Sequence, residues 1–214
     1  MPEGTFVTTY ALIGASDFNA AYFAERAARG AFDAVIAVDG GFASLEAAGC
    51  VPDLALGDFD SLGFVPEGVP VKLFPAEKDA SDMELALEEA LTRGAGAVEV
   101  YGALGGRLDH TLANLSLLAS FAERGLDVVA VGERERIALL VGPGELLIEA
   151  ADEGIVSVFS LSDVATGVCE AGLKYGLDHV ALTNRTSWGL SNELAGAAAR
   201  ISVESGTLAV FLPL

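Results

Sequence analysis

Cysteine and basic residues are scarce in this 214-residue chain. Its two cysteines, Cys50 and Cys169, are too few for a disulfide framework or a cysteine-based metal cluster. Only 12 lysines and arginines stand against 31 aspartates and glutamates, which gives a formal net charge of -19. A field of this sign repels nucleic acids and anionic membrane surfaces, and it attracts metal ions and positively charged small molecules. The composition therefore argues against a nucleic-acid or membrane partner.

Long apolar runs are also missing. No uninterrupted hydrophobic stretch approaches the length that spans a bilayer, and the segment Met1–Thr5 lacks the basic and apolar regions of a signal peptide. Hydrophobic residues nevertheless make up 52% of the chain, which is enough for a sizeable core and argues against extensive disorder. We therefore expect a soluble cytoplasmic protein with one large domain or two small ones.

The first part of the chain, up to Val131, alternates apolar runs with segments of helical spacing. This alternation predicts an α/β domain whose mainly parallel sheet is flanked by helices. The predicted strands are Phe6–Ile13, Ala34–Val38, Leu54–Leu56, Val71–Phe74, Ala97–Tyr101 and Asp127–Val131. The predicted helices are Asp17–Gly30, Phe42–Ala48, one that Ser81 and Glu84 begin as a capping box, and one that ends near Arg124 with Leu108, Leu112, Leu115 and Ala119 toward the core.

The pattern changes after the charged segment at residues 132–136. Short apolar runs separated by Gly, Pro and Asp turns, with no helical pattern among them, predict an all-β antiparallel sandwich. The predicted strands are Ile137–Val141, Glu145–Ile148, Ile155–Ser160, Gly167–Cys169, Gly172–Tyr175, Ala181–Leu182, Ala199–Glu204 and Thr207–Leu212. We therefore expect an α/β domain over residues 1–133 and a β-sandwich domain over residues 134–214.

Two carboxylates follow the predicted strand Leu54–Leu56. Asp58 and Asp60 are separated by one residue, so in an extended segment their side chains point to the same side. Two ionised carboxylates at this range repel unless a cation lies between them, and Mg2+ is typically held by carboxylates together with substrate phosphates. The alternative is a solvated acidic turn, which commonly ends a strand.

Further acids and two of the scarce bases fall in the same set of loops. They are Asp39, Lys78, Asp79, Asp82, Arg107 and Asp109. Ligands of open α/β sheets bind outside the carboxyl ends of the strands, where these residues are predicted to lie. Gly105-Gly106 before a helix lets backbone N–H groups approach an anion. Acids for a metal and bases for a phosphate at one sheet edge predict a phosphoryl-transfer site.

The order of four short motifs resembles that of the thiamine pyrophosphokinase family. The motifs are Asp39-Gly40-Gly41, Gly57-Asp58-Phe59-Asp60-Ser61, Lys78-Asp79-x-Ser81-Asp82-x-Glu84 and Gly105-Gly106-Arg107-x-Asp109-His110. The resemblance continues through Gly172-Leu173-Lys174-Tyr175 and Ser191-Asn192-Glu193, and it covers most of the chain from about Asp39 onward. The chain departs from the family at Ser81, where threonine is usual, and over Asn184–Leu190, where Trp188 has no clear counterpart.

This resemblance implies that the protein uses Mg2+ to transfer a pyrophosphoryl group from ATP to the hydroxyl of thiamine, releasing AMP. The candidate metal ligands are Asp58, Asp60, Asp82 and Asp109, which with Arg107 form the candidate catalytic set. The candidate ATP-binding residues are Asp39, Gly40, Lys78, Asp79, Gly105, Gly106, Arg107 and His110, and those for thiamine are Tyr175, Trp188, Ser191 and Asn192. The resemblance also implies a homodimer whose thiamine pockets lie between the α/β domain of one subunit and the β domain of the other.

Several of these assignments have simpler alternatives. Asp82 also suits the first turn of a helix because of the helix dipole, and Arg107 also suits a structural ion pair with a nearby carboxylate. Tyr175 and Trp188 suit an aromatic wall for the positive thiazolium ring, and equally the ordinary packing of a sandwich. His110 invites a general-base role, although support of its neighbours at the helix start is the favoured interpretation.

Two other functions stay open at the level of sequence. Asp58-Phe59-Asp60 after an apolar strand has the general form of an aspartyl-nucleophile site, so a Mg2+-dependent phosphatase that releases inorganic phosphate is one. A non-catalytic nucleotide or thiamine sensor, which would bind without turnover, is the other. An ordinary P-loop or dinucleotide site is disfavoured, because neither G-x-x-x-x-G-K-[ST] nor a strand-linked G-x-G-x-x-G occurs.

Overall fold

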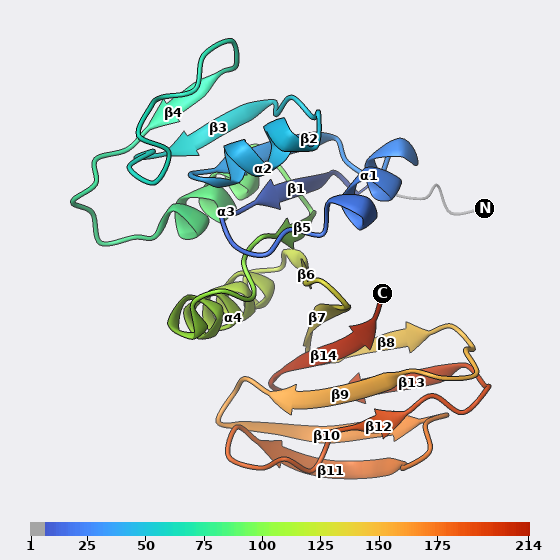
Figure 1. Cartoon of the computed structure of the whole chain (residues 1–214). Helices are drawn as coiled ribbons and strands as arrows, with labels where there is room; N and C mark the ends of the chain where they lie inside the picture. The colour runs from blue at the N-terminus through green and yellow to red at the C-terminus, as the bar shows by residue number, and fades with distance from the viewer. Residues whose placement is uncertain (1–6) are drawn as a thin grey trace. The chain divides into compact units, whose positions relative to one another are not determined.

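The computed structural model describes residues 7–214, and the predicted strand start at Phe6 lies outside the described residues. The chain divides into two compact units (Figure 1). An α/β unit contains the described residues up to Leu117 together with Gly125–Glu133, and a β unit contains Leu118–Arg124 and Arg134–Leu214. Within the described range, no helix combines the length and the apolar character needed to cross a membrane.

Parallel strands form the sheet of the α/β unit. Their order is β6-β5-β1-β2-β3-β4. The bounds are β1 Thr9–Ile13, β2 Ala34–Val38, β3 Leu54–Gly57, β4 Val71–Leu73, β5 Ala97–Tyr101 and β6 Asp127–Val131. The chain adds strands on one side of β1 and then, after β4, returns to pair β5 with its other side. The carboxyl ends of β1 and β5 therefore form a topological switch point, where such sheets bind ligands.

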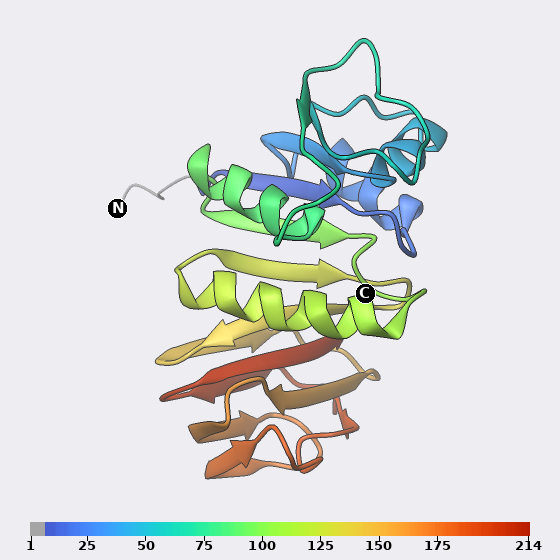
Figure 2. The same ribbon diagram turned by 90° about the vertical axis from the view of Figure 1, so that its left-hand side faces the viewer.

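Helices cover both faces of this parallel sheet. They are α1 Ala20–Ala28, α2 Gly41–Ala47 and α3 Asp82–Thr92, and a fourth helix, α4 Leu108–Glu123, follows β5. Phe23 of α1 and Leu45 of α2 pack in one buried cluster with Ala11 and Ile13 of β1. Alternate residues of a strand point to opposite faces, so Leu12 points the other way. Figure 2 shows α3, in green, lying over the strands, and α3 contacts β1, β2 and β3. The predicted α/β architecture is confirmed.

The amino-terminal half of α4 differs from its prediction. The buried residues of α4 all lie in its carboxyl-terminal half, and they are Leu118, Ala119, Phe121 and Ala122. Leu108 and Leu112, which were predicted to face the core, are 81% and 67% exposed. That part of the prediction was wrong. Helical spacing shows which side chains share a face, but it does not show whether anything packs against that face.

Antiparallel strands form the β unit, as predicted. One set has the order β12-β9-β14-β7 and the other β11-β10-β13-β8. The bounds are β7 Glu135–Val141, β8 Gly144–Ile148, β9 Ile155–Ser160, β10 Val164–Ala171, β11 Leu177–Thr183, β12 Asn192–Glu193, β13 Ala199–Val203 and β14 Thr207–Pro213. Buried residues of both sets, including Val158, Val168, Ile201 and Val210, form one hydrophobic cluster. The two sheets therefore share a core, as in a sandwich.

The strands β10 and β11 depart most from the predicted pattern. The predicted strand Gly172–Tyr175 is not formed, because Leu173 makes only an isolated bridge with Leu194. Both β10 and β11 are longer than the predicted Gly167–Cys169 and Ala181–Leu182. Their pairing contains register shifts on either side of Val168. Gly167, with φ +63°, supplies the backbone conformation that such an irregularity needs, and it interrupts the apolar run that the sequence shows.

Candidate functional site

A cleft of about 810 Å3 lies at the carboxyl ends of β1, β2, β3 and β5. This is the topological switch point of the α/β unit. The predicted site residues that line the cleft are Asp39, Asp58, Asp60, Lys78, Asp82, Gly106, Arg107 and His110. Gly40, Asp79, Gly105 and Asp109 belong to the same loops without lining it.

Three carboxylates converge in this cleft. Oxygens of Asp39, Asp58 and Asp82 lie within 4.8 Å of one another, and all three residues are half-buried. Oδ1 of Asp39 is buried and has no hydrogen-bond partner within the described chain, and the buried Oδ1 of Asp82 has only the Lys78 ammonium group nearby, at 3.1 Å. Converging carboxylate oxygens with free lone pairs are the ligands that a hard cation such as Mg2+ requires. The residues present therefore fit a magnesium ion.

The backbone explains why Asp39 joins this group and Asp60 does not. Phe59 is buried and has φ +58°, so the segment turns and the predicted extended alternation of Asp58 with Asp60 was wrong. Asp60 is exposed, and its N–H donates to Oδ1 of Asp58 at 3.2 Å. A Cβ on Gly57 would lie 3.1 Å from Cα of Asp39, so glycine lets the end of β3 pass close to Asp39.

Local interactions position the carboxylates of Asp39 and Asp82. Ser61 donates its hydroxyl to Oδ2 of Asp39 at 2.7 Å. Asp82 is the first residue of α3, whose N-cap Ser81 accepts a hydrogen bond from the N–H of Glu84 at 3.2 Å. This confirms Ser81 as the predicted cap, and it places the Asp82 carboxylate at the positive end of the helix dipole.

Lys78 lies between two of the carboxylates. Its Nζ donates to Oδ2 of Asp58 at 2.7 Å and forms an ion pair with Oδ1 of Asp82 at 3.1 Å. The hydrogen bond from Lys78 holds the pKa of Asp58 below its usual value. The pKa of Asp82 is raised, because burial disfavours its charged form more than Lys78 favours it. Burial also opposes the charge of Lys78, but the two carboxylates outweigh this effect and raise the pKa of the lysine.

A second charged group lies at the start of α4. Arg107 donates through Nε to Oδ1 of Asp109 at 3.1 Å and through a terminal nitrogen to Oδ2 at 2.6 Å. Arg107 lowers the pKa of Asp109 to about 2. Both side chains are at least 65% exposed, so solvent screens the pair and its contribution to stability is small. Asp109 is thus paired with Arg107 and lies apart from the three converging carboxylates.

Some residues that line the cleft were not predicted from the sequence. The loop Gly14-Ala15-Ser16-Asp17 follows β1 and borders the cleft beside the loop after β5. A Cβ on Gly14 would lie 2.5 Å from the carbonyl oxygen of Gly102, so the two loops approach as closely as glycine allows. Asn114 of α4 also lines the cleft and donates to the carbonyl oxygen of Ala103 at 2.8 Å. In the sequence, the glycine directly after a buried strand could have indicated that the first loop borders a site. No comparable sequence feature marked Asn114.

A separate pocket of about 260 Å3 lies within the β unit. Three of the four predicted thiamine residues, Tyr175, Trp188 and Asn192, line it. The fourth, Ser191, does not line the pocket, and its N–H donates to the hydroxyl of Ser157 at 3.0 Å. Tyr175 and Trp188 are exposed, so their rings are available to a ligand rather than packed in the core.

Glu170 is the unpredicted residue of this pocket. It is only 2% exposed, and its Oε2 accepts a hydrogen bond from Nδ2 of Asn192 at 2.7 Å. Oε1 is buried without a hydrogen-bond partner in the described chain. Burial raises the pKa of Glu170, and the hydrogen bond from Asn192 opposes this only in part. Val168 and Glu170 share the inward face of β10, so a longer predicted strand would have shown a carboxylate on a buried face.

Comparison with known proteins identifies the family. The model of the family described as "Thiamin pyrophosphokinase, catalytic domain" matches residues 29–130. The thiamine pyrophosphokinase of Bacillus subtilis (strain 168) is 31% identical over 180 residues, which are 81% of this chain and 84% of the relative. The chain belongs to the thiamine pyrophosphokinase family.

Solved structures of the thiamine pyrophosphokinase family share the fold. The crystal structure of the Bacillus subtilis thiamine pyrophosphokinase has a TM-score of 0.80 and 27% identity, over 96% of this chain and 99% of that one. A thiamin pyrophosphokinase family protein from Enterococcus faecalis has a TM-score of 0.79 and 30% identity, over 97% and 99% of the two chains. The matched range 29–130 contains the three carboxylates, Lys78 and Arg107. The pocket of the β unit lies beyond that range, within the span that the structures cover.

Proposed function

We propose that this chain is an enzyme that transfers a pyrophosphoryl group from ATP to the hydroxyl of thiamine, giving thiamine diphosphate and AMP in a Mg2+-dependent reaction. Family membership supports the reaction class. The observation that carries the proposal is the convergence of Asp39, Asp58 and Asp82 within 4.8 Å in an open cleft. Such a group of acids has little use for stability, because like charges at this range repel.

The three carboxylates would hold Mg2+, which when bound neutralises phosphate charge and orients the transferred group. Lys78 keeps Asp58 ionised and offers a positive charge in the same cleft. Asp60, two residues after Asp58, also lines the cleft and is a candidate to bind the metal through a water molecule. The protein forms no covalent bond to the transferred group in such a reaction. Catalysis therefore depends on positioning of the substrates and on stabilisation of charge.

Arg107 is the proposed phosphate-binding residue. Its guanidinium already makes a two-contact pair with a carboxylate, and the same planar group fits phosphate oxygens equally well. A phosphate on Arg107 would release Asp109, which would then become available to the metal or to solvent. Gly105 and Gly106, with φ +81° and +59°, lead into the amino-terminal end of α4, where backbone N–H groups favour an anion.

The pocket of the β unit is the proposed thiamine pocket. Trp188 and Tyr175 offer aromatic faces, which attract the positively charged thiazolium ring. Glu170 and Asn192 supply the polar side of the pocket, and the unpartnered Oε1 of Glu170 is an acceptor for a group of the substrate. A small pocket with aromatic walls and a few fixed polar groups is typical of a small-molecule site.

Product analysis tests this function directly. The full chain, incubated with ATP, thiamine and Mg2+, should produce thiamine diphosphate and AMP in equal amounts, as measured by chromatography and 31P NMR. An aspartyl-nucleophile phosphatase would instead release inorganic phosphate without needing thiamine, and a sensor would bind without turnover. Either of those results would remove the proposed function.

We further propose that the functional unit is a homodimer whose active sites combine the cleft of one chain with the thiamine pocket of its partner. Sedimentation should show two chains per particle. Mixing Asp58→Asn chains with Trp188→Ala chains then tests the shared site, because a mixed dimer regains one intact site. Random mixing should restore about a quarter of the wild-type activity, whereas sites within single chains would leave the mixture inactive.

A further inference from the structure

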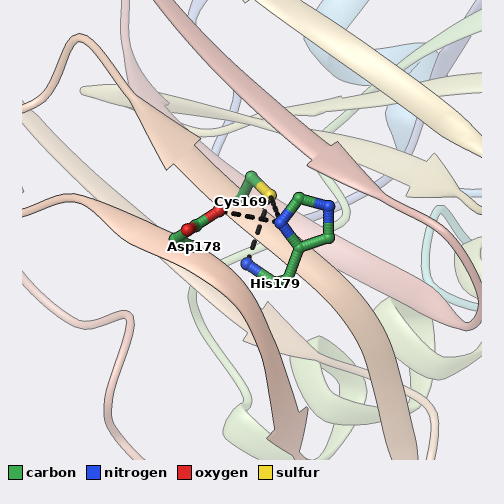
Figure 3. A group of neighbouring side chains, drawn as sticks. All are labelled: Cys169, Asp178 and His179. Carbon is green, nitrogen blue, oxygen red and sulfur yellow. Dashed lines mark hydrogen bonds and ion pairs between the residues drawn. The ribbon is translucent and has the colours of Figure 1, made fainter.

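Three potential metal ligands, none of which lines either pocket, meet on the strands β10 and β11. They are Cys169, Asp178 and His179, whose ligand atoms all lie within 4.8 Å of one another (Figure 3). Nδ1 of His179 lies 3.5 Å from Sγ of Cys169 and 2.7 Å from Oδ1 of Asp178. Val168 and Glu170 are buried on one face of β10, so Cys169 between them points to the opposite face.

The separations fit a tetrahedral zinc-type ion. Bonds of about 2.3 Å to sulfur and about 2.0 Å to nitrogen, at a tetrahedral angle, place the two ligand atoms about 3.5 Å apart. This is the separation found between Sγ of Cys169 and Nδ1 of His179. The Asp178 oxygen lies closer to Nδ1 than two metal ligands would, but its side chain is almost fully exposed and free to rotate outward.

Two backbone features hold the sulfur of Cys169 and the imidazole of His179 next to each other. His179 adopts φ +49°, a conformation that costs energy for a residue with a side chain, and its N–H donates to Sγ of Cys169 at 3.3 Å. A metal ion binds such a sulfur in its thiolate form. This combination of backbone strain and an N–H donor fixes the imidazole and the thiol next to each other (Figure 3).

Glu204 lies within ion-pair range of the outer nitrogen of His179, although beyond hydrogen-bond distance. Its Oε1 lies 3.8 Å from Nε2 of His179, the nitrogen opposite the one that faces Cys169. The Glu204 side chain reaches this position across Gly167, where any Cβ would collide with it. A carboxylate that accepts the second ring N–H of a histidine orients the ring and makes its other nitrogen a better ligand.

We propose that Cys169, His179 and Asp178 form a binding site for a zinc-type divalent cation, with water as the fourth ligand and Glu204 orienting the imidazole. On binding, the Cys169 thiol gives its proton to solvent and the thiolate bonds to the metal. The sulfur and nitrogen ligands select zinc-like ions over Mg2+, whereas the carboxylates of the cleft prefer Mg2+. The two sites therefore take different ions, and the new site crosslinks β10 to β11.

Cobalt titration of the full chain tests this proposal. Co2+ is the probe, because a thiolate bound to it produces a near-ultraviolet charge-transfer band, and excess Mg2+ keeps the carboxylate cleft occupied. The wild-type protein should show one such band per chain, and Zn2+ should abolish it by competition. The band should be lost in Cys169→Ser and should need at least about tenfold more Co2+ in His179→Asn, in line with the loss of a ligand.

Two further variants distinguish Co2+ binding at the proposed site from binding elsewhere on the chain. Cys50→Ser removes the other cysteine, in which burial raises the thiol pKa, and it should leave the band unchanged. Glu204→Gln keeps the size of the side chain and should weaken Co2+ binding severalfold without removing the band. A wild-type chain with no charge-transfer band, or a band that survives in Cys169→Ser or disappears in Cys50→Ser, would overturn the proposal. Circular dichroism of each variant checks that it is folded.

Discussion

Nζ of Lys78 lies 2.7 Å from Oδ2 of Asp58, and both side chains are largely buried in the cleft. The same ammonium group lies 3.1 Å from Oδ1 of Asp82. The chain thus places one of its few positive charges between two of the carboxylates that are proposed to bind metal. Lys78 reduces their repulsion and holds the pKa of Asp58 low, whereas burial raises the pKa of Asp82.

Replacing Lys78 with methionine should shift the acidic limb of the pH–activity profile to higher pH. Lys78 lowers the pKa of Asp58 and limits the rise of the Asp82 pKa that burial causes. Without the ammonium group both carboxylates take up protons at higher pH, and the ionised, metal-binding form is lost sooner as the pH falls. The expected shift is about one pH unit or more, measured as kcat/KM against pH.

Lys72 offers a matched control for this experiment. It lies on β4 and pairs with Glu89 at 2.6 Å, outside the cleft. Lys72→Met removes the same charge from the chain but should leave the acidic limb where it is. An unshifted profile in Lys78→Met, or an equal shift in both variants, would show that Lys78 does not control the carboxylates of the cleft.

Asp58→Asn should lower kcat by about 100-fold or more, because it removes a carboxylate from the proposed metal site. Asp60→Asn should have a smaller effect, because the Asp60 side chain is exposed and lies outside the converging group. Kinetics over a range of Mg2+ concentrations, with circular dichroism to check folding, measure both. Equal losses in the two variants would place Asp60 among the direct ligands, and near-normal turnover in Asp58→Asn would remove it from the metal site.

The sequence was enough to predict the parallel sheet and the acidic edge, because apolar runs and the residues that follow them are local features. It was not enough to predict which acids converge. Asp39 and Asp58 meet because Gly57 lets two loops pass closely, whereas Asp60 lies outside the converging group because the chain turns at Phe59, whose φ is +58°. Such backbone conformations depend on the packing of the buried Phe59 ring, and that packing is set by the whole fold.

Arg107→Lys should lower kcat by roughly tenfold to a hundredfold while changing the KM for ATP less. The lysine keeps the positive charge but loses the planar group that holds two oxygens at once, so positioning of the phosphates suffers. Steady-state kinetics with ATP as the varied substrate measure the effect. Asp109→Asn is the matched variant, since it removes the present partner of Arg107. Normal kinetics in Arg107→Lys would leave Arg107 as a structural residue only.

The β unit shows a second limit of sequence interpretation. Tyr175, Trp188 and Asn192 were predicted to bind thiamine, and the structure brings all three to one pocket. Glu170 was missed, because Gly167 made β10 look short and hid the inward position of the carboxylate. Cys169 and His179 were also missed as a pair, since ten residues and a strand reversal separate them.

Glu170→Gln should raise the KM for thiamine about tenfold with little change in kcat, because the loss of one charged contact affects substrate binding rather than phosphate chemistry. Glutamine keeps the size of the side chain and an acceptor for Asn192, so the pocket should stay formed. The wild-type KM should also depend on pH. Burial raises the pKa of Glu170, so its neutral form persists to higher pH than an exposed glutamate's, and the attraction for the thiazolium cation grows as the pH rises through that pKa.

The pH dependence distinguishes this role from simple packing. In Glu170→Gln the dependence of the thiamine KM on pH should disappear, because no titrating group remains at that position. Glu145→Gln is the control, since Glu145 is an exposed carboxylate of β8 that pairs with Arg200 and lies outside the pocket. Its thiamine KM and pH dependence should match those of the wild type. If Glu170→Gln retained the wild-type KM and its pH dependence, Glu170 would be a buried structural group with no contact to thiamine.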